Sequence, residues 1–87
     1  MELNDILYVE SSGNYMQFAL TAQKILSRLT MAEVEALLPV DDFIRIHRSY
    51  LVAKSRVTKI DKSNVWVGSI LLPVGPAYAG EVEKLVR

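Results

Sequence analysis

The 87-residue chain contains no cysteine and a single histidine, His47. Without thiolates it can form neither a disulfide framework nor a thiolate metal site, and one imidazole without a patterned carboxylate set gives no metal site either. The apolar runs are short and interrupted by charged residues or proline, so no transmembrane helix is expected. Residues 1–5 are acidic and lack the basic region and apolar core of a signal peptide. These absences predict a cytoplasmic domain with no metal, no cofactor and no membrane partner.

The composition is that of a folded domain. Hydrophobic residues make up 51% of the chain, which excludes general disorder. The length corresponds to one domain, near the small end of what folds without disulfides or metals. No internal repeat, low-complexity segment or linker divides the sequence, so residues 1–87 are interpreted as a single domain.

Positive and negative charges balance over the whole chain, with ten of each, but they are unevenly distributed. Residues 43–62 hold six Lys or Arg against a single acid, Asp61, a net charge of +5. The rest of the chain holds four Lys or Arg against nine Asp or Glu, a net charge of −5. This separation predicts one face that attracts a polyanion and another that repels it, which points to nucleic acid.

Alternating, β-rich segments separated by turn signals predict a mostly β protein with antiparallel strands. The clearest turns are Ser-Ser-Gly-Asn at 11–14 and Asp-Lys-Ser-Asn at 61–64. Strands are expected at residues 5–10, 15–20, 23–27, 43–46, 50–53, 57–60, 65–67 and 70–72.

Two helices interrupt the strands. Thr30 and Glu33 form a capping-box pattern that opens a short internal helix, and Pro39 ends it. Gly75 as N-cap with Pro76 at the first helical position predicts a C-terminal helix. The expected apolar stripes are Met31, Val34, Leu37 and Leu38 in the first helix and Tyr78, Val82, Leu85 and Val86 in the second.

The segment Phe-Ile-Arg-Ile-His-Arg-Ser-Tyr-Leu-Val at residues 43–52 carries a resemblance to a known family. Together with residues 5–15, 29–35 and 70–78, it resembles the LytTR family of DNA-binding domains over nearly the whole chain. The resemblance implies elongated antiparallel β-sheets with one short internal helix and a C-terminal helix. Such domains are usually the output half of bacterial response regulators. They place loops, rather than a recognition helix, into successive grooves of double-stranded DNA.

The chain departs from the family pattern at three places. The family usually has a strand before the segment that begins at Asp5, which predicts that this chain is excised from a longer response regulator and lacks the usual first strand. Ala53 stands where Asn is frequent. Residues 75–77, Gly-Pro-Ala, replace a segment in which many members carry a basic residue that reaches DNA.

Arg48 and Ser49 follow the point where strand alternation breaks, and the resemblance implies that they face a groove. An Arg at such a turn can bond a guanine edge bidentately or clamp a phosphate, while the plain alternative is a solvated surface residue. His47 is expected to support the loop through a hydrogen bond. A nucleophilic site built from His47, Ser49 and an Asp at 41 or 42 lacks a nucleophile turn and an oxyanion nest, so the chain is not expected to be an enzyme.

Residues of the first turn form a second groove-facing loop under the same resemblance, with Asn14 able to read an adenine edge and Tyr15 and Met16 beside it. The alternative is that Asn14 only favours the turn itself. Thr30 caps a helix whose free amides could take a phosphate, although capping alone explains it.

Three basic residues of the span 43–62 are predicted to contact phosphates. Lys54 and Arg56 lie in a polar turn between strands and are expected to meet the DNA backbone. Arg45 could do the same, or it could simply be solvated, with at most a surface pair to an Asp at 41 or 42. Tyr8 and Trp66 sit inside alternating strands and are expected to pack rather than to stack on bases.

These observations favour a sequence-specific double-stranded DNA-binding domain that acts as the effector of a two-component transcriptional regulator. Its expected partners are DNA and an N-terminal receiver domain, with a dimer on DNA and a monomer for the isolated domain. The alternative is a protein-interaction or scaffold domain of the same fold that has lost DNA contact, which zero net charge and residues 75–77 favour.

Overall fold

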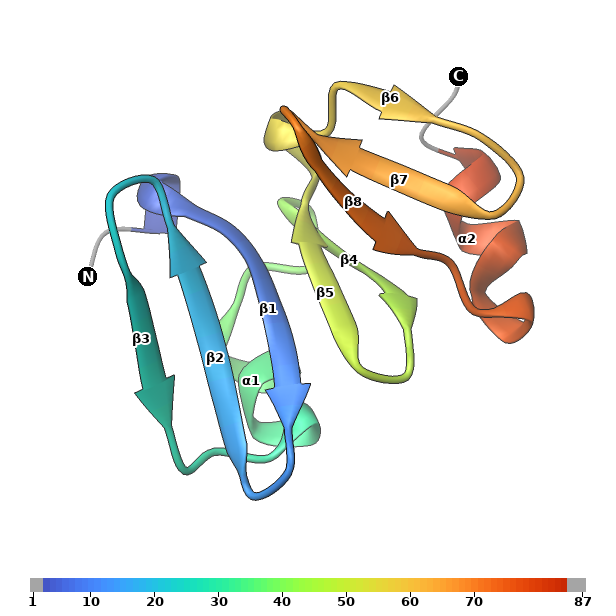
Figure 1. The fold of residues 1–87 in the computed structure, drawn as a ribbon. Coiled ribbons are helices and arrows are strands. Elements are labelled where there is room, and N and C mark those ends of the chain that lie inside the picture. The colour runs from blue at the N-terminus through green and yellow to red at the C-terminus, as the bar shows by residue number, and fades with distance from the viewer. Residues whose placement is uncertain (1–2, 85–87) are drawn as a thin grey trace.

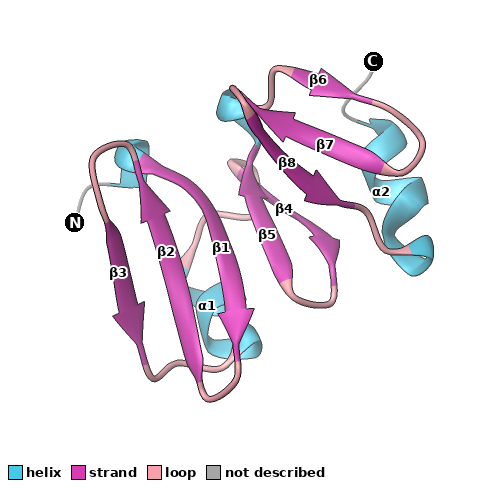
Figure 2. Cartoon of the chain, viewed as in Figure 1, coloured by secondary structure: helices cyan, strands magenta, loops and turns pink. Residues whose placement is uncertain are grey.

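The computed structural model describes residues 3–84 as two antiparallel sheets and two short α-helices (Figures 1 and 2). The strands are β1 (Ile6–Ser12), β2 (Tyr15–Leu20), β3 (Lys24–Ser27), β4 (Phe43–His47), β5 (Tyr50–Ala53), β6 (Lys59–Ile60), β7 (Asn64–Val67) and β8 (Ile70–Pro73). The helices are α1 (Met31–Leu37) and α2 (Ala79–Glu83), with single 3-10 turns η1 (Leu3–Asp5), η2 (Lys54–Arg56) and η3 (Pro76–Tyr78). The predicted mostly β fold with an internal and a C-terminal helix is confirmed.

The larger sheet has five strands in the order β3-β2-β1-β5-β4, and the smaller has three in the order β6-β7-β8. Sequence neighbours pair throughout, except that β1 pairs with β5, where Val9 lies opposite Leu51. This one long-range pairing joins the N-terminal hairpin to the β4–β5 hairpin. It therefore decides which turns of the chain lie next to one another (Figure 1).

A bulge in β1 lets one strand serve both faces of the larger sheet. The register with β2 shifts between Ile6 and Tyr8. Ile6 and Val9 pack into one hydrophobic cluster, while Leu7 and Tyr8 pack into the other. A bulge places two successive residues on the same face, which explains how four consecutive apolar residues are all accommodated.

The first hydrophobic cluster lies between the larger sheet and α1. The predicted capping box is present: the Thr30 hydroxyl accepts from the Glu33 amide at 3.1 Å, and the Glu33 carboxylate accepts from the Thr30 amide at 3.0 Å. The helix ends before Pro39, also as predicted, and Val34 and Leu38 are buried at 0% and 7% exposure.

The prediction that Leu37 belongs to the apolar stripe of α1 is wrong, because this side chain is 67% exposed. Successive residues of a helix turn by about 100°, so Met31 and Leu38 fall on one side of Val34 and Leu37 falls on the other. The sheet contacts only the first side.

The second cluster lies between the two sheets and α2. Tyr8, Ile46 and Val52 of the larger sheet share this cluster with Val65 of the smaller sheet and Val82 of α2. Gly75 and Pro76 open the C-terminal helical segment as predicted, although its first turn is the 3-10 turn η3.

Several smaller expectations concern the same region. Tyr8 packs in the core as predicted, and Trp66 is half-buried opposite Lys59, whose ammonium lies 4.8 Å from the indole ring. Leu85 and Val86 of the predicted C-terminal stripe lie outside the described residues. Within residues 3–84, the helices are too short and too polar to cross a membrane.

Candidate nucleic-acid interface

Two hairpin turns meet at one end of the larger sheet. Because β1 and β5 are antiparallel, the end of β1 and the start of β5 lie together, with Glu10 opposite Tyr50. The Ser11 amide donates to the Ser49 carbonyl at 2.8 Å and joins the β1–β2 turn to the β4–β5 turn. We call this edge of the molecule the turn end, comprising residues 12–15, 28–30 and 47–49. In Figure 1 the β1–β2 turn is at the bottom, and the β4–β5 turn points the same way from higher up.

The β1–β2 turn exposes part of the predicted site and buries another part. Gly13 has a φ of +62°, in the left-handed region that favours glycine. Asn14 is exposed and Tyr15 is 38% exposed. Met16 is only 2% exposed and belongs to the first hydrophobic cluster. Because neighbouring residues of a strand face opposite sides, exposing Tyr15 buries Met16 and leaves its side chain almost no surface for contact with DNA.

Arg28 joins the turn end from the loop between β3 and α1. It lies beside Tyr15, with its Nη2 donating to the phenol oxygen at 3.4 Å and its guanidinium 5.6 Å from the ring. Both residues line a hollow that also includes Asn14 and Thr30. The charge count over residues 43–62 missed Arg28, and its position two residues before the capping Thr30 was the signal that could have indicated it.

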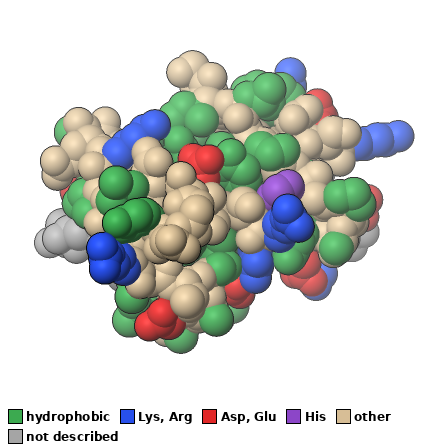
Figure 3. Space-filling model, turned by 60° about the horizontal axis from the view of Figure 1, so that its bottom comes forward, with side chains coloured by type: hydrophobic (Ala, Val, Ile, Leu, Met, Phe, Trp, Pro, Cys, Tyr) green, Lys and Arg blue, Asp and Glu red, His purple; other side chains and the backbone are tan. Residues whose placement is uncertain are grey.

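The β4–β5 turn places Arg48 in solvent on a firmly held backbone. The Ser49 amide donates to His47 Nδ1 at 3.1 Å, so the expected structural role of His47 is confirmed. The His47 ring also meets Tyr50 edge-on at 5.5 Å. Arg48 is exposed and Ser49 half-buried. In Figure 3, which looks more directly onto this end, the histidine lies beside a basic side chain.

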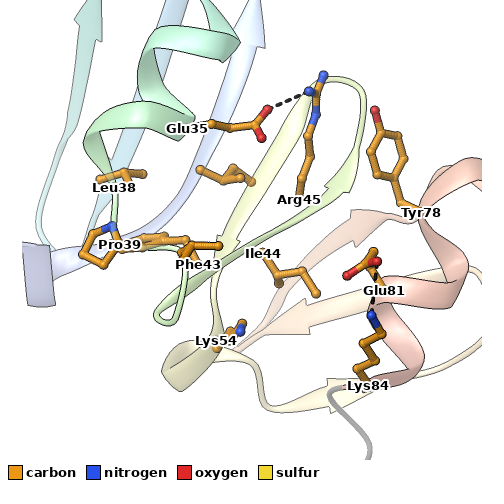
Figure 4. A pocket seen from close by; sticks show the side chains of 12 residues that line it. Glu35, Leu38, Pro39, Phe43, Ile44, Arg45, Lys54, Tyr78, Glu81 and Lys84 are labelled. Carbon is orange, nitrogen blue, oxygen red and sulfur yellow. Dashed lines mark hydrogen bonds and ion pairs between the residues drawn. The ribbon is translucent and has the colours of Figure 1, made fainter.

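Arg45 lies behind the β4–β5 turn, and the alternative of a pair with Asp41 or Asp42 is wrong. Its Nη1 donates to the Glu35 carboxylate at 2.7 Å instead. Its Nη2 and Nε donate to the carbonyls of Arg48, at 2.7 Å, and His47, at 3.3 Å. Figure 4 shows the guanidinium between Glu35 and Tyr78, whose ring centre lies 5.4 Å away.

Lys54 and Arg56 lie at the other end of the same sheet, in η2 after β5 (Figure 1). We call this end of the larger sheet the opposite end, comprising residues 3–5, 41–42 and 54–56. Arg56 donates to the Asn4 carbonyl, and the Lys54 amide donates to the Asp42 carbonyl at 2.8 Å. The basic span 43–62 is therefore not one continuous face. On the face that Figure 3 shows, Lys and Arg side chains stand apart from one another.

Residues 75–77, which depart from the family pattern, pack beside the turn end. The Gly75 amide donates to the Ile46 carbonyl at 2.8 Å. A Cβ at Gly75 would lie 3.2 Å from the Tyr78 ring and 3.5 Å from the His47 ring. Pro76 and Ala77 are exposed. The glycine thus permits close packing behind His47, while no basic side chain is supplied by residues 75–77.

Tyr50 lies beneath the junction of the two turns. Its hydroxyl donates to the Glu10 carboxylate at 3.1 Å. Burial, and then this hydrogen bond and the Glu10 charge, raise the pKa of Tyr50 above its usual 10.0. The pair joins β1 to β5 one residue away from the Ser11–Ser49 bond.

Comparisons with known proteins agree with this arrangement. The CO-responsive transcriptional regulator RcoM of Rhodospirillum rubrum is 35% identical over 57 residues, which are 66% of this chain and 24% of that protein. The heme-containing CO-sensing transcriptional regulator RcoM 2 of Paraburkholderia xenovorans is 29% identical over 93 aligned positions, 99% of this chain and 35% of that protein. The chain thus spans about a quarter to a third of the length of these relatives.

A solved structure shares the fold. It is a LytTr DNA-binding domain from Bacillus cereus, described as part of a methyl-accepting/DNA response regulator. The two structures superpose with a TM-score of 0.90 at 24% identity, over 99% of this chain and 84% of the other. The family model of the LytTr DNA-binding domain matches residues 1–85. The chain therefore belongs to the LytTr family of DNA-binding domains.

Proposed function

We propose that this domain binds double-stranded DNA sequence-specifically through its turn end, as the effector of a two-component transcriptional regulator. The observation that carries the proposal is the junction of the two turns. The Ser11–Ser49 bond holds them side by side, and each presents an exposed polar side chain, Asn14 on one and Arg48 on the other. Polar side chains fixed on a rigid sheet end are suited to reach base edges in a groove.

Each exposed residue of the turn end has a role that matches its chemistry. Arg48 bonds a guanine edge or a phosphate, and Asn14 bonds an adenine edge. Tyr15 holds Arg28 in place, and the Arg28 guanidinium meets a phosphate. Ser49 lies in the β4–β5 turn and Thr30 lines the hollow beside the β1–β2 turn, so both add contacts to the DNA backbone.

Lys54 and Arg56 belong to a more distant part of the proposed contact. The four residues of β5 separate them from Arg48, a rise of about 13 Å. A duplex seated on the turn end meets these two residues only at its margin. Their proposed contribution is to the general attraction of phosphates rather than to sequence preference.

The regulatory context is proposed from the relatives. The solved LytTr domain is described as part of a response regulator, whereas the curated relatives are named as CO-sensing regulators. We place an N-terminal receiver domain before this one, with phosphorylation promoting dimers on DNA and the isolated domain monomeric. The gene sequence upstream of residue 1 tests this: a receiver with a phosphorylatable Asp supports it, and a sensor of another type overturns it.

Binding-site selection followed by affinity measurement tests the DNA proposal. Anisotropy of a selected duplex and a random duplex across a salt series should show a preference, with log K falling by about 0.9 per neutralised phosphate for each unit of log salt. No binding to any duplex at low salt would contradict it.

The alternative is a protein-interaction domain of the same fold. The exposed Pro76 and Ala77 favour it, because they give an uncharged surface next to Gly75, which packs against His47, where many family members carry a basic residue. Replacing Ala77 with Arg separates the two functions. A gain in duplex affinity supports the DNA-binding proposal, while an unchanged absence of binding supports the alternative.

A further inference from the structure

The Arg45 side chain is already bonded to other parts of the protein, unlike an exposed side chain that is free to bind a phosphate. Its side chain is only 29% exposed, and each of its three nitrogens has an acceptor. Two of these acceptors are the backbone carbonyls of His47 and Arg48, on the β4–β5 turn itself. The remaining contacts are with Glu35 on α1 and the Tyr78 ring on η3.

The backbone around Arg48 is held from several directions. The Arg45 side chain donates to the carbonyls of residues 47 and 48. The Ser49 amide donates to His47 Nδ1, and the Ser49 carbonyl accepts from the Ser11 amide. The Arg48 side chain is left exposed. A turn fixed in this way loses less conformational entropy when its side chain binds a ligand.

The planar guanidinium is the part that a different cation cannot replace. One group donates to three acceptors at once while its central carbon lies 5.4 Å from the centre of the Tyr78 ring, and Figure 4 shows it between Glu35 and Tyr78. An ammonium is a compact point charge without the fixed fork, so Lys at this position keeps the charge and loses the geometry.

We infer that Arg45 is a positioning residue for the DNA-reading turn and not a DNA contact. It links α1 and η3 to the turn backbone and thereby sets the direction of the Arg48 side chain. The inference rests on the proposed function of the turn end, and it replaces the phosphate contact that the sequence predicts for Arg45.

Salt dependence separates positioning from phosphate contact. Arg45→Gln removes a charge, and a phosphate ligand would then lower the salt slope by about 0.9. As a positioning residue, Arg45→Gln and Arg45→Lys should both weaken binding to the selected duplex about tenfold, the size of one lost charge-assisted hydrogen bond, with the slope unchanged. A reduced slope for Arg45→Gln, or full affinity for Arg45→Lys, overturns the inference.

A double-mutant cycle with Arg48 tests whether the two residues act together. If Arg45 works through Arg48, then Arg45→Lys should cost about tenfold in wild type and almost nothing in an Arg48→Ala background. Equal losses in both backgrounds overturn the inference. Glu35→Gln is the matched control because it loosens the guanidinium from the other side and leaves Arg45 itself intact; it should weaken binding less, with the slope again unchanged.

Hydrogen exchange supplies a readout that does not depend on DNA. In Arg45→Lys the Ser49 amide should exchange about tenfold faster, while the amides of β1 at Tyr8 and Val9 keep wild-type rates. Equal acceleration everywhere indicates general destabilisation and overturns the inference. If wild type binds no duplex, the proposed function fails, and this measurement still decides whether Arg45 holds the turn.

Discussion

The two ends of the larger sheet differ in what their charges do. The turn end contains two arginines and no acid within its defined residues. Three acids lie nearby, and each is bonded: Glu10 to Tyr50, Glu33 to the helix cap and Glu35 to Arg45. The opposite end contains two basic residues, Lys54 and Arg56, together with three acids, Asp5, Asp41 and Asp42. Equal numbers of basic residues therefore stand without an acid within one defined end and beside three acids within the other.

The difference shows that basic residues close together in the sequence need not share one surface of the folded domain. Arg48 and Lys54 are six positions apart in the sequence, yet β5 carries them to opposite ends of the sheet. The position of each basic residue before or after its strand decides which surface it joins. A substitution that acts at one end should therefore leave the other unchanged, which the following experiments test.

The largest expected effect removes the packing of α1 on the larger sheet. Leu38 anchors α1 against the sheet at 7% exposure, so Leu38→Ala should lower the free energy of unfolding by about 2–5 kcal/mol. Leu37→Ala is the matched control, because that side chain is 67% exposed, and it should cost less than about 0.5 kcal/mol. Urea unfolding measures both, and similar costs would contradict the assignment of the buried side of α1.

Arg48→Ala should break sequence reading at the turn end. Loss of a bidentate base contact should cost about 1–3 kcal/mol on the selected duplex and much less on random DNA. Paired anisotropy titrations measure the difference. Equal losses on both duplexes would make Arg48 a phosphate clamp and leave specificity to Asn14 or to DNA shape.

Lys54→Ala tests whether the opposite end of the sheet takes part in DNA binding. If the duplex sits on the turn end, the affinities for both duplexes should fall by less than about 0.5 kcal/mol, as for a marginal surface charge. The salt slope should stay near the wild-type value. A slope smaller by about 1 would show that Lys54 contacts a phosphate directly and that DNA extends over both ends.

The smallest expected effect concerns the pair beneath the turns. The pKa of Tyr50 is raised by burial and by Glu10, so the folded state keeps its proton at a pH where the unfolded chain loses it. This contribution to stability is complete below about pH 10 and is lost as the pH rises through the raised pKa. Tyr50→Phe should therefore lose stability less steeply above about pH 10 than wild type does. Urea midpoints at alkaline pH test it, and parallel curves would contradict it.

Local features of this molecule could be predicted from the sequence because their causes are local. The capping box at Thr30, the helix end before Pro39 and the loop-supporting His47 depend on residues within a few positions of each other. The strand segments followed from alternation and turn residues in the same way.

The remaining features depend on contacts between distant segments. The pairing of β1 with β5, the Arg45–Glu35 bond and the place of Arg28 at the turn end all require the tertiary arrangement. Burial of Met16 was the exception, since alternation from Tyr15 could have indicated it.

The bond between the Ser11 amide and the Ser49 carbonyl consists of main-chain atoms alone. Substitution at residues 14 or 48 changes the chemistry that each turn presents but leaves this bond, and thus the spacing between the turns, in place. The larger sheet therefore fixes the distance between the two turns, while the exposed side chain on each turn can be changed separately. Selecting new residues at 14 and 48 should retarget the domain to other base pairs at the same separation, without redesign of the fold.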